Sequence, residues 1–124
     1  ATVDVEYTYQ RRASEQAPKD VTVLHFADDV TEIHDRAFFA CVKLQSLLSL
    51  QLLNTIGNYA FAFCRALVSI TSFPPGLKSI GSYAFYVCKA LSSIPPFPPT
   101  LTTIGYGAFQ YCRALSQFLI SHHL

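Results

Sequence analysis

The chain has 124 residues, of which 51% are hydrophobic and 14% charged, whereas about 25% are charged in an average globular protein. This length suits one domain with its own core, and so hydrophobic a composition excludes a largely disordered chain. Nine Lys/Arg against eight Asp/Glu give a net charge of +1, which excludes binding to nucleic acid through an overall basic surface. Because the chain begins with Ala1 and contains no Met, we expect a processed form or a fragment.

The charges are unevenly distributed along the chain. Residues 1–35 hold all eight acidic residues and three basic ones, a net charge of −5, whereas residues 36–124 hold six basic residues and no acid, a net charge of +6. An enzyme needs convergent titratable groups, so the lack of acids after residue 35 argues against catalysis. The sequence therefore predicts no catalytic residue, metal site or cofactor.

The first ten residues have the pattern of a strand. Val3, Val5, Tyr7 and Tyr9 alternate with polar residues, and this two-residue period is typical of a half-buried strand. The next segment, residues 11–20, is mostly polar and charged, so we expect a mobile connector there. Neither segment follows the pattern of the rest of the chain, and the strand is expected to lie outside its register.

From residue 21 to residue 120 the chain repeats itself. Four nine-residue segments align, each beginning with Ile and ending with Cys, and their cysteines are 23, 24 and 24 residues apart. A repeat of this length with an apolar framework indicates a solenoid, in which each repeat buries its apolar face against the next. The segments are Ile33–Cys41, Ile56–Cys64, Ile80–Cys88 and Ile104–Cys112, and the apolar ladder inside them includes Phe38, Phe61, Phe85 and Phe109.

One repeat is expected to contain two extended pieces and two turns. Residues 67–70 predict a short strand, followed by a proline-rich turn, a second extended piece at residues 77–80 and a tight turn at Gly81. The sequence therefore predicts a mainly β solenoid of about four rungs and a partial fifth, with short strands and little regular helix. We expect residues 121–124 to form a tail, which lies outside the part of the chain that the structure describes.

The repeat pattern L-x-x-I, P, L-x-x-I-G-x-x-A-F-x-x-C closely resembles the BspA-like class of leucine-rich repeats over residues 21–120. The first repeat departs from it, with His34 and Asp35 where glycine is usual and no proline in its turn, and it looks like a cap or an edge. That class is associated with cell-surface adhesion and with binding of extracellular proteins. The resemblance therefore implies a protein partner and an extracellular or cell-surface location.

The four cysteines, Cys41, Cys64, Cys88 and Cys112, hold the same place in successive repeats. We expect them to stack about 5 Å apart, the spacing of neighbouring strands, as small buried side chains. A disulfide between neighbouring rungs would need converging Cβ vectors, and no C-x-x-C pair supports a zinc site. The uncharged run 44–64 is interrupted by polar residues and follows the repeat, so no membrane span is expected.

Two sets of side chains are candidates for an interaction surface. Arg65, Lys89 and Arg113 each follow a cysteine directly, so they should form a column that either faces an acidic partner or is solvated and screened by salt. The second set consists of tyrosines beside this column, some of them expected in the core and others in an exposed strip of the kind enriched in interfaces. These tyrosines are Tyr59, Tyr83, Tyr86, Tyr106 and Tyr111.

Three hypotheses for function follow from these features. In the first, copies associate head to tail into a filament or larger assembly because the two ends carry opposite charges. The N-terminal strand, with Val3, Val5, Tyr7 and Tyr9, would then complete the last rung of a neighbour, although it could equally fold back as a cap on its own first rung. In the second, the chain is a fragment of a cell-surface adhesion or ligand-binding protein. The third is a small subunit within a large assembly.

Overall fold

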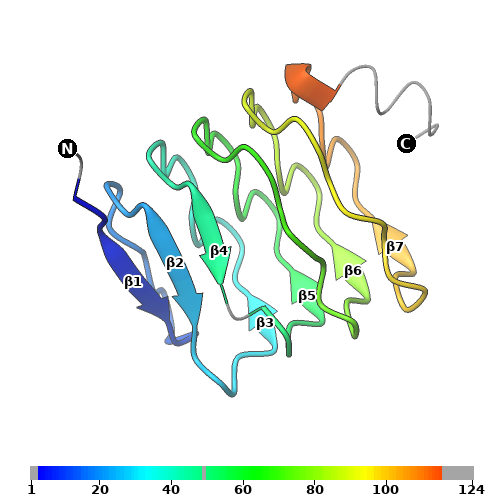
Figure 1. Ribbon diagram of the computed structural model, residues 1–124. Helices are drawn as coiled ribbons and strands as arrows, with labels where there is room; N and C mark the ends of the chain where they lie inside the picture. The colour runs from blue at the N-terminus through cyan, green and yellow to red at the C-terminus, as the bar shows by residue number, and fades with distance from the viewer. Residues whose placement is uncertain (1–2, 49, 116–124) are drawn as a thin grey trace.

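The computed structural model describes residues 3–48 and 50–115, which form a row of rungs from the N-terminal to the C-terminal end (Figure 1). The described part contains seven short strands and one 3-10 turn. Their bounds are β1 Glu6–Tyr9, β2 Val23–Phe26, β3 Glu32–Ile33, β4 Ser46–Leu48, β5 Thr55–Ile56, β6 Ser79–Ile80, β7 Thr103–Ile104 and η1 Arg113–Leu115. The prediction of a mainly β solenoid with little helix is confirmed.

The strands form two parallel sheets that run along the stack. One sheet has the order β1-β2-β4 and the other the order β3-β5-β6-β7. The register follows the sequence repeat, because Leu24 pairs with Leu47 and Ile80 pairs with Ile104. An isolated parallel bridge joins Ser69 to Ser93 outside the two sheets. Ser69 lies in the extended piece that was expected at residues 67–70.

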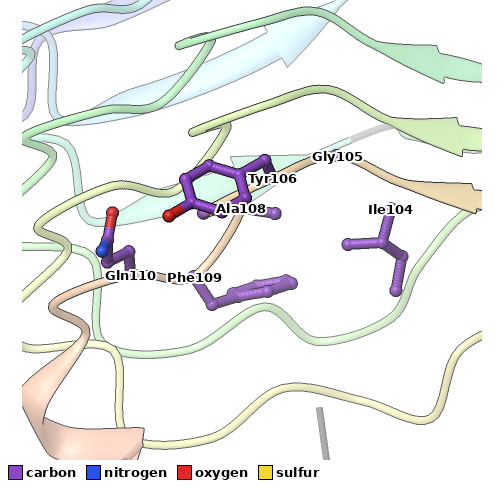
Figure 2. Close-up of a pocket in the computed structure, with 7 residues that line it drawn as sticks. Ile104, Gly105, Tyr106, Ala108, Phe109 and Gln110 are labelled. Atoms are coloured by element: carbon purple, nitrogen blue, oxygen red, sulfur yellow. The ribbon is translucent and has the colours of Figure 1, made fainter.

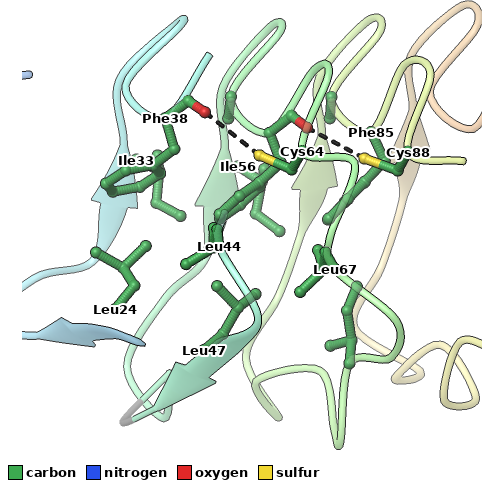
Figure 3. Close-up of a cluster of buried hydrophobic side chains, with 14 of the residues drawn as sticks. Leu24, Ile33, Phe38, Leu44, Leu47, Ile56, Cys64, Leu67, Phe85 and Cys88 are labelled. Atoms are coloured by element: carbon green, nitrogen blue, oxygen red, sulfur yellow. Dashed lines mark hydrogen bonds between the residues drawn. The ribbon is translucent and has the colours of Figure 1, made fainter. Parts of the chain in front are cut away.

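Identical side chains stack on one another in the core. The rings of Phe38, Phe61, Phe85 and Phe109 lie 5.2 Å apart from centroid to centroid in each successive pair, and Figure 3 shows part of this cluster. Burying one such side chain contributes about 1.5–3 kcal/mol. Since Phe61 and Phe85 each have a stacked ring on both sides, a rung gains this energy only when its neighbours are in place.

Each Ile-to-Cys segment forms a turn that we call a corner. Within a corner, alternate backbone N–H groups donate to carbonyls of the next rung, for example Phe61 to Ala84 at 2.7 Å and Phe63 to Tyr86 at 2.7 Å. The intervening N–H groups bond within the rung, as from Ala62 to Tyr59 at 3.2 Å. This pattern requires positive φ at two places in every corner. These residues are Arg36, Ala40, Tyr59, Phe63, Tyr83, Val87, Gly107 and Tyr111.

The N-terminal strand β1 extends the first sheet. It pairs in parallel with β2, with Glu6 opposite Val23 and Tyr9 opposite Phe26, so the expectation that it lies outside the register is wrong. The reason is that pairing needs only matching backbone, and 17 residues suffice to return the chain where later rungs use 23 or 24. In this structure, the strand folds back on its own subunit and pairs with β2.

Residues 11–20, expected as a mobile connector, are held by specific contacts. The Glu15 carboxylate accepts hydrogen bonds from the Tyr7 hydroxyl at 2.5 Å and from the Arg12 N–H at 2.8 Å. The Lys19 ammonium donates to the carbonyl oxygen of Phe39, and Arg11 pairs with Glu32. This segment therefore covers the N-terminal side of the first corner.

The glycine that follows Ile in later corners is replaced by His34 in the first. A Cβ added to Gly57 would lie 2.6 Å from the carbonyl oxygen of Ile33, and one added to Gly81 would lie 2.6 Å from the N atom of Asn58. Glycine is therefore required where a rung packs closely on the backbone of the one before it. His34 has Tyr9 on that side, with ring centroids 6.5 Å apart, so its side chain has room.

Candidate protein-binding surface

The corners carry a continuous set of aromatic side chains on the outside of the stack. One line runs through Phe63, Tyr86 and Tyr111, with ring centroids 5.5 and 5.8 Å apart. A second runs through Tyr59 and Tyr83, which stack at 5.1 Å, and on to Tyr106 at 5.7 Å. We call this set, together with Phe39, the aromatic strip.

The two lines of the strip are joined at several points. Tyr83 lies 5.2 Å from Tyr86 in an edge-to-face arrangement, and Phe39 contacts both Tyr59 and Phe63. Such pairs are each worth about 0.5–1.5 kcal/mol beyond the area they bury. The strip is therefore a preorganised surface, with its rings fixed by one another before any partner arrives.

Exposure varies along the strip. Tyr106 and Tyr111, on the last described rung, are 74% and 57% exposed, whereas Tyr59, Tyr83 and Tyr86 are half-buried. The sequence did not separate core from surface tyrosines, because both kinds lie in the same nine-residue segment. Burial raises the pKa of Tyr83, and its tyrosine neighbours add to this shift, so its hydroxyl stays neutral at physiological pH.

The structure adds an arginine to the strip that the sequence analysis did not select. The Arg36 guanidinium lies 4.6 Å from the ring centroid of Tyr59 and 5.1 Å from that of Phe39, within the range of cation–π attraction. A signal was present in the sequence, because Arg36 occupies the place in its repeat that Tyr59 and Tyr83 occupy in theirs.

One residue of the predicted basic column, Arg65, adjoins the strip. Arg65, Lys89 and Arg113 are all exposed, and the Arg65 guanidinium lies 5.8 Å from the ring centroid of Phe63. Residues 36–124 contain no acid, so these cations have no carboxylate from their own part of the chain. Arg65 thus brings a positive charge next to the aromatic rings.

The candidate residues of the N-terminal strand have different surroundings. Val3 is 86% exposed and Val5 is half-buried. Tyr7 is half-buried, and burial together with the Glu15 carboxylate raises its pKa to about 12. Tyr9 is fully buried, packs 5.0 Å from Phe38, and accepts a hydrogen bond from the His34 N–H at 3.0 Å. Tyr9 is therefore a core residue and cannot belong to an exposed interface in this fold.

The cysteines are all buried and free. The Sγ atoms of Cys64, Cys88 and Cys112 donate to the carbonyl oxygens of Phe38, Phe61 and Phe85 at 3.4, 3.1 and 3.0 Å, and two of these contacts are drawn in Figure 3. Each thiol thus ties its rung to the preceding one. Burial raises the pKa of Cys64, which keeps this thiol protonated and unreactive.

The described residues offer little for chemistry. Within residues 3–48 and 50–115, no group of three or more His, Cys, Asp or Glu is placed to hold a metal ion. In the same residues, no helix has the length and hydrophobicity needed to cross a membrane. What the described part presents is a surface.

The repeat geometry and its sequence pattern agree with a known family. A model of the BspA-type leucine-rich repeat region, in six copies, matches residues 16–124. The chain belongs to this family. BspA-type repeats generally bind proteins and are generally not enzymes, and the predicted resemblance is thereby confirmed. No curated protein matches the chain.

Solved structures of leucine-rich repeat proteins are similar in fold to this chain. The leucine-rich repeat protein of T. pallidum, TpLRR, is 28% identical with a TM-score of 0.76, over 89% of this chain and 49% of that one. One from Bacteroides ovatus is 28% identical with a TM-score of 0.78, over 89% and 29% of the two chains. A leucine-rich cell surface protein from Faecalibacterium prausnitzii is 23% identical with a TM-score of 0.61, over 77% and 32%. This chain spans about half or less of their lengths.

Proposed function

We propose that this chain is a non-catalytic protein-binding module whose aromatic strip and basic column together bind an acidic protein surface. The observation that carries the proposal is the continuity of the strip from Phe39 to Tyr111 beside three exposed cations. Tyrosine and arginine are the residues that dominate binding energy in protein interfaces. The rings are also held in place by stacking, which reduces the entropy cost of binding.

The partner chemistry follows from the charge. Six basic residues and no acid in residues 36–124 favour a partner rich in Asp and Glu. A cell-surface location, as for the F. prausnitzii protein that is named a cell surface protein, would make this module part of an adhesion or ligand-binding protein. The contact itself depends only on the strip and the column.

We predict that Lys89→Glu weakens binding to a soluble copolymer of glutamate and tyrosine by about fivefold or more, because it replaces an attraction with a repulsion next to the strip. Lys78→Glu is the matched control, since Lys78 is equally exposed but lies outside the column. Binding is measured by interferometry with the polymer immobilised. Equal losses in the two variants would mean that only overall charge matters, and unchanged binding of Lys89→Glu would exclude this surface.

Head-to-tail self-association is the second candidate function, and it would produce a homo-oligomer or filament. It is favoured by the opposite charges of residues 1–35 and 36–124 and by the exposed Ile104, Tyr106 and Tyr111 at the C-terminal end of the described stack. It ranks second because β1 pairs with its own subunit. In addition, His34 stands where close stacking of a rung requires glycine.

A further inference from the structure

Most backbone hydrogen bonds between corners run in one direction, although the N–H groups of Gly81 and Gly105 donate the other way, to Ile56 and Ile80 of the preceding rung. In the first three corners, three alternate N–H groups donate toward the C-terminal neighbour, as Tyr83, Phe85 and Val87 do to Tyr106, Ala108 and Gln110 at 3.0, 2.8 and 2.9 Å. The corner backbone therefore has an electrically positive end at the last rung, much as a helix has one at its N-terminus. At the opposite end, the carbonyl oxygen of Phe39 accepts from the Lys19 ammonium, a cation at the negative end.

The last described corner repeats this geometry without a neighbour. Gly107 and Tyr111 have φ of 66° and 61°, matching Tyr83 at 58° and Val87 at 57°. By this equivalence the N–H groups of Gly107, Phe109 and Tyr111 point out of the C-terminal face. Within residues 3–48 and 50–115 none of the three has an acceptor. Unpaired N–H groups along the edge of a sheet form concavities that bind anions.

The surroundings of this row suit a charged peptide with apolar parts. A hollow of about 550 Å³ is lined by Ile104, Tyr106 and Phe109 among other residues of the same corner, and Figure 2 shows these side chains along the last rung. Arg113 is exposed one residue after Cys112. The hollow thus combines apolar walls, three N–H donors and a nearby cation, with no acid in residues 36–124 to oppose an anion.

We propose that this last corner, from Ile104 to Arg113, is a second binding site, which takes the carboxylates of an extended acidic peptide. The carboxylates accept from Gly107, Phe109 and Tyr111, and the stems of the Glu side chains cover Ile104 and Tyr106. Charge complementarity selects this occupant. A second copy of the chain is disfavoured because its first corner carries His34 and is covered by Lys19. The site shares Tyr106 and Tyr111 with the aromatic strip and Arg113 with the basic column, and it differs from the proposed function in using the three backbone N–H groups of the last described corner.

The test is a titration of the full chain with acetylated, amidated tetraglutamate, followed by amide proton and nitrogen NMR shifts. The tetraglutamine peptide is the matched control without charge. We expect the amides of Gly107, Phe109 and Tyr111 to shift downfield with the glutamate peptide and not with the glutamine peptide, because charge-assisted hydrogen bonds are the stronger ones. Arg113→Gln should weaken this binding by about threefold, and Lys78→Gln should leave it unchanged.

Three results would overturn the proposal. The first is the absence of shifts at these amides. The second is slow solvent exchange of the three amides in the peptide-free chain, which would show that the segment after Leu115 already occupies the row. The third is a set of shifts confined to Phe63 and Tyr83 and abolished by Arg65→Gln, which would support the aromatic strip alone. Conversely, shifts at the three amides together with no effect of Lys89→Glu on polymer binding would sustain this site and reject the proposed function.

Discussion

The residue after the corner isoleucine decides how closely two rungs approach. At Gly81 and Gly105 an added Cβ would lie 2.6 and 2.3 Å from backbone atoms of the preceding rung, distances that a real structure avoids by moving the rungs apart. A Cβ at Gly76, in the proline turn, would meet nothing within 4 Å. Glycine is therefore needed for close packing of rungs at Gly81 and Gly105, whereas no contact requires it at Gly76. Only the surrounding atoms in the folded structure distinguish the two cases.

We predict that Gly81→Ala lowers the free energy of unfolding by about 1–3 kcal/mol or more, because the stacked rings and hydrogen bonds on both sides must shift. Gly76→Ala, the control, should change it by no more than about 0.5 kcal/mol. Urea denaturation followed by circular dichroism measures both. Equal effects would show that the loss comes from the backbone freedom of glycine and not from rung contact.

A single carboxylate organises the N-terminal cap. Burial by itself would raise the pKa of Glu15, but hydrogen bonds from the Tyr7 hydroxyl and from the Arg12 and Gln10 N–H groups outweigh it, and the pKa is lowered. The ionised form is therefore favoured by folding. The ionised Glu15 carboxylate contributes fully to stability above its pKa in the unfolded chain, about 4.3. This contribution is lost as the pH falls through the lower pKa that Glu15 has in the folded chain.

We predict that the thermal midpoint of the wild-type chain falls between about pH 5 and pH 3, and that Glu15→Gln flattens this part of the profile. Asp29→Asn is the control, since Asp29 is exposed and should leave the slope nearly unchanged. Differential scanning fluorimetry across the pH range provides the measurement. A slope that Glu15→Gln does not alter would assign the acid sensitivity to other carboxylates.

At the scale of elements, β1 closes a stack that would otherwise begin with an uncovered ring. Phe38 has Phe61 on one side and Tyr9 on the other, with centroids 5.2 and 5.0 Å away. The Tyr9 hydroxyl also accepts from the N–H of His34, which has no rung before it. A short strand of four residues thus supplies both an apolar lid and a hydrogen bond acceptor.

We predict that Tyr9→Ala destabilises the chain by about 3–5 kcal/mol, the usual cost of removing a buried aromatic ring. Tyr106→Ala, which removes a ring that is 74% exposed and contacts Tyr83, should cost no more than about 1.5 kcal/mol. Chemical denaturation of both variants measures the difference. If Tyr9→Ala were as mild as its control, β1 would not be the lid that Phe38 needs.

At the scale of the whole molecule, the described stack has two unlike ends. The N-terminal end is covered by β1 and residues 10–20, with Lys19 on the first corner. The C-terminal end of the described part exposes Ile104 and Tyr106. The two ends also differ in charge, because residues 1–35 have a net charge of −5 and residues 36–124 a net charge of +6. In a solenoid each repeat contacts only its neighbours, so the covered N-terminal end and the opposite charges of the two segments give the described stack a polarity.

Sedimentation velocity tests whether this polarity drives self-association. If copies associate head to tail through charge, we predict concentration-dependent growth of the sedimentation coefficient at low salt and its loss at about 1 M salt, where the Debye length falls to about 3 Å. Replacing Asp4 and Glu6 by Lys should abolish the growth, whereas Lys78→Gln should not. A monomer at every concentration and salt would reject the second candidate function.

The sequence by itself determined the architecture, because a period of 23 or 24 residues fixes which side chains must stack. It placed the corners from Ile33 to Cys112 and marked the first of them as an edge through His34. The tertiary structure decided which side each side chain faces: Tyr9 entered the core, Arg36 joined the strip, and β1 paired with its own subunit. The physical reason is that repetition specifies contacts between equivalent positions, whereas the contacts of a non-repeating segment depend on how its backbone happens to reach the stack.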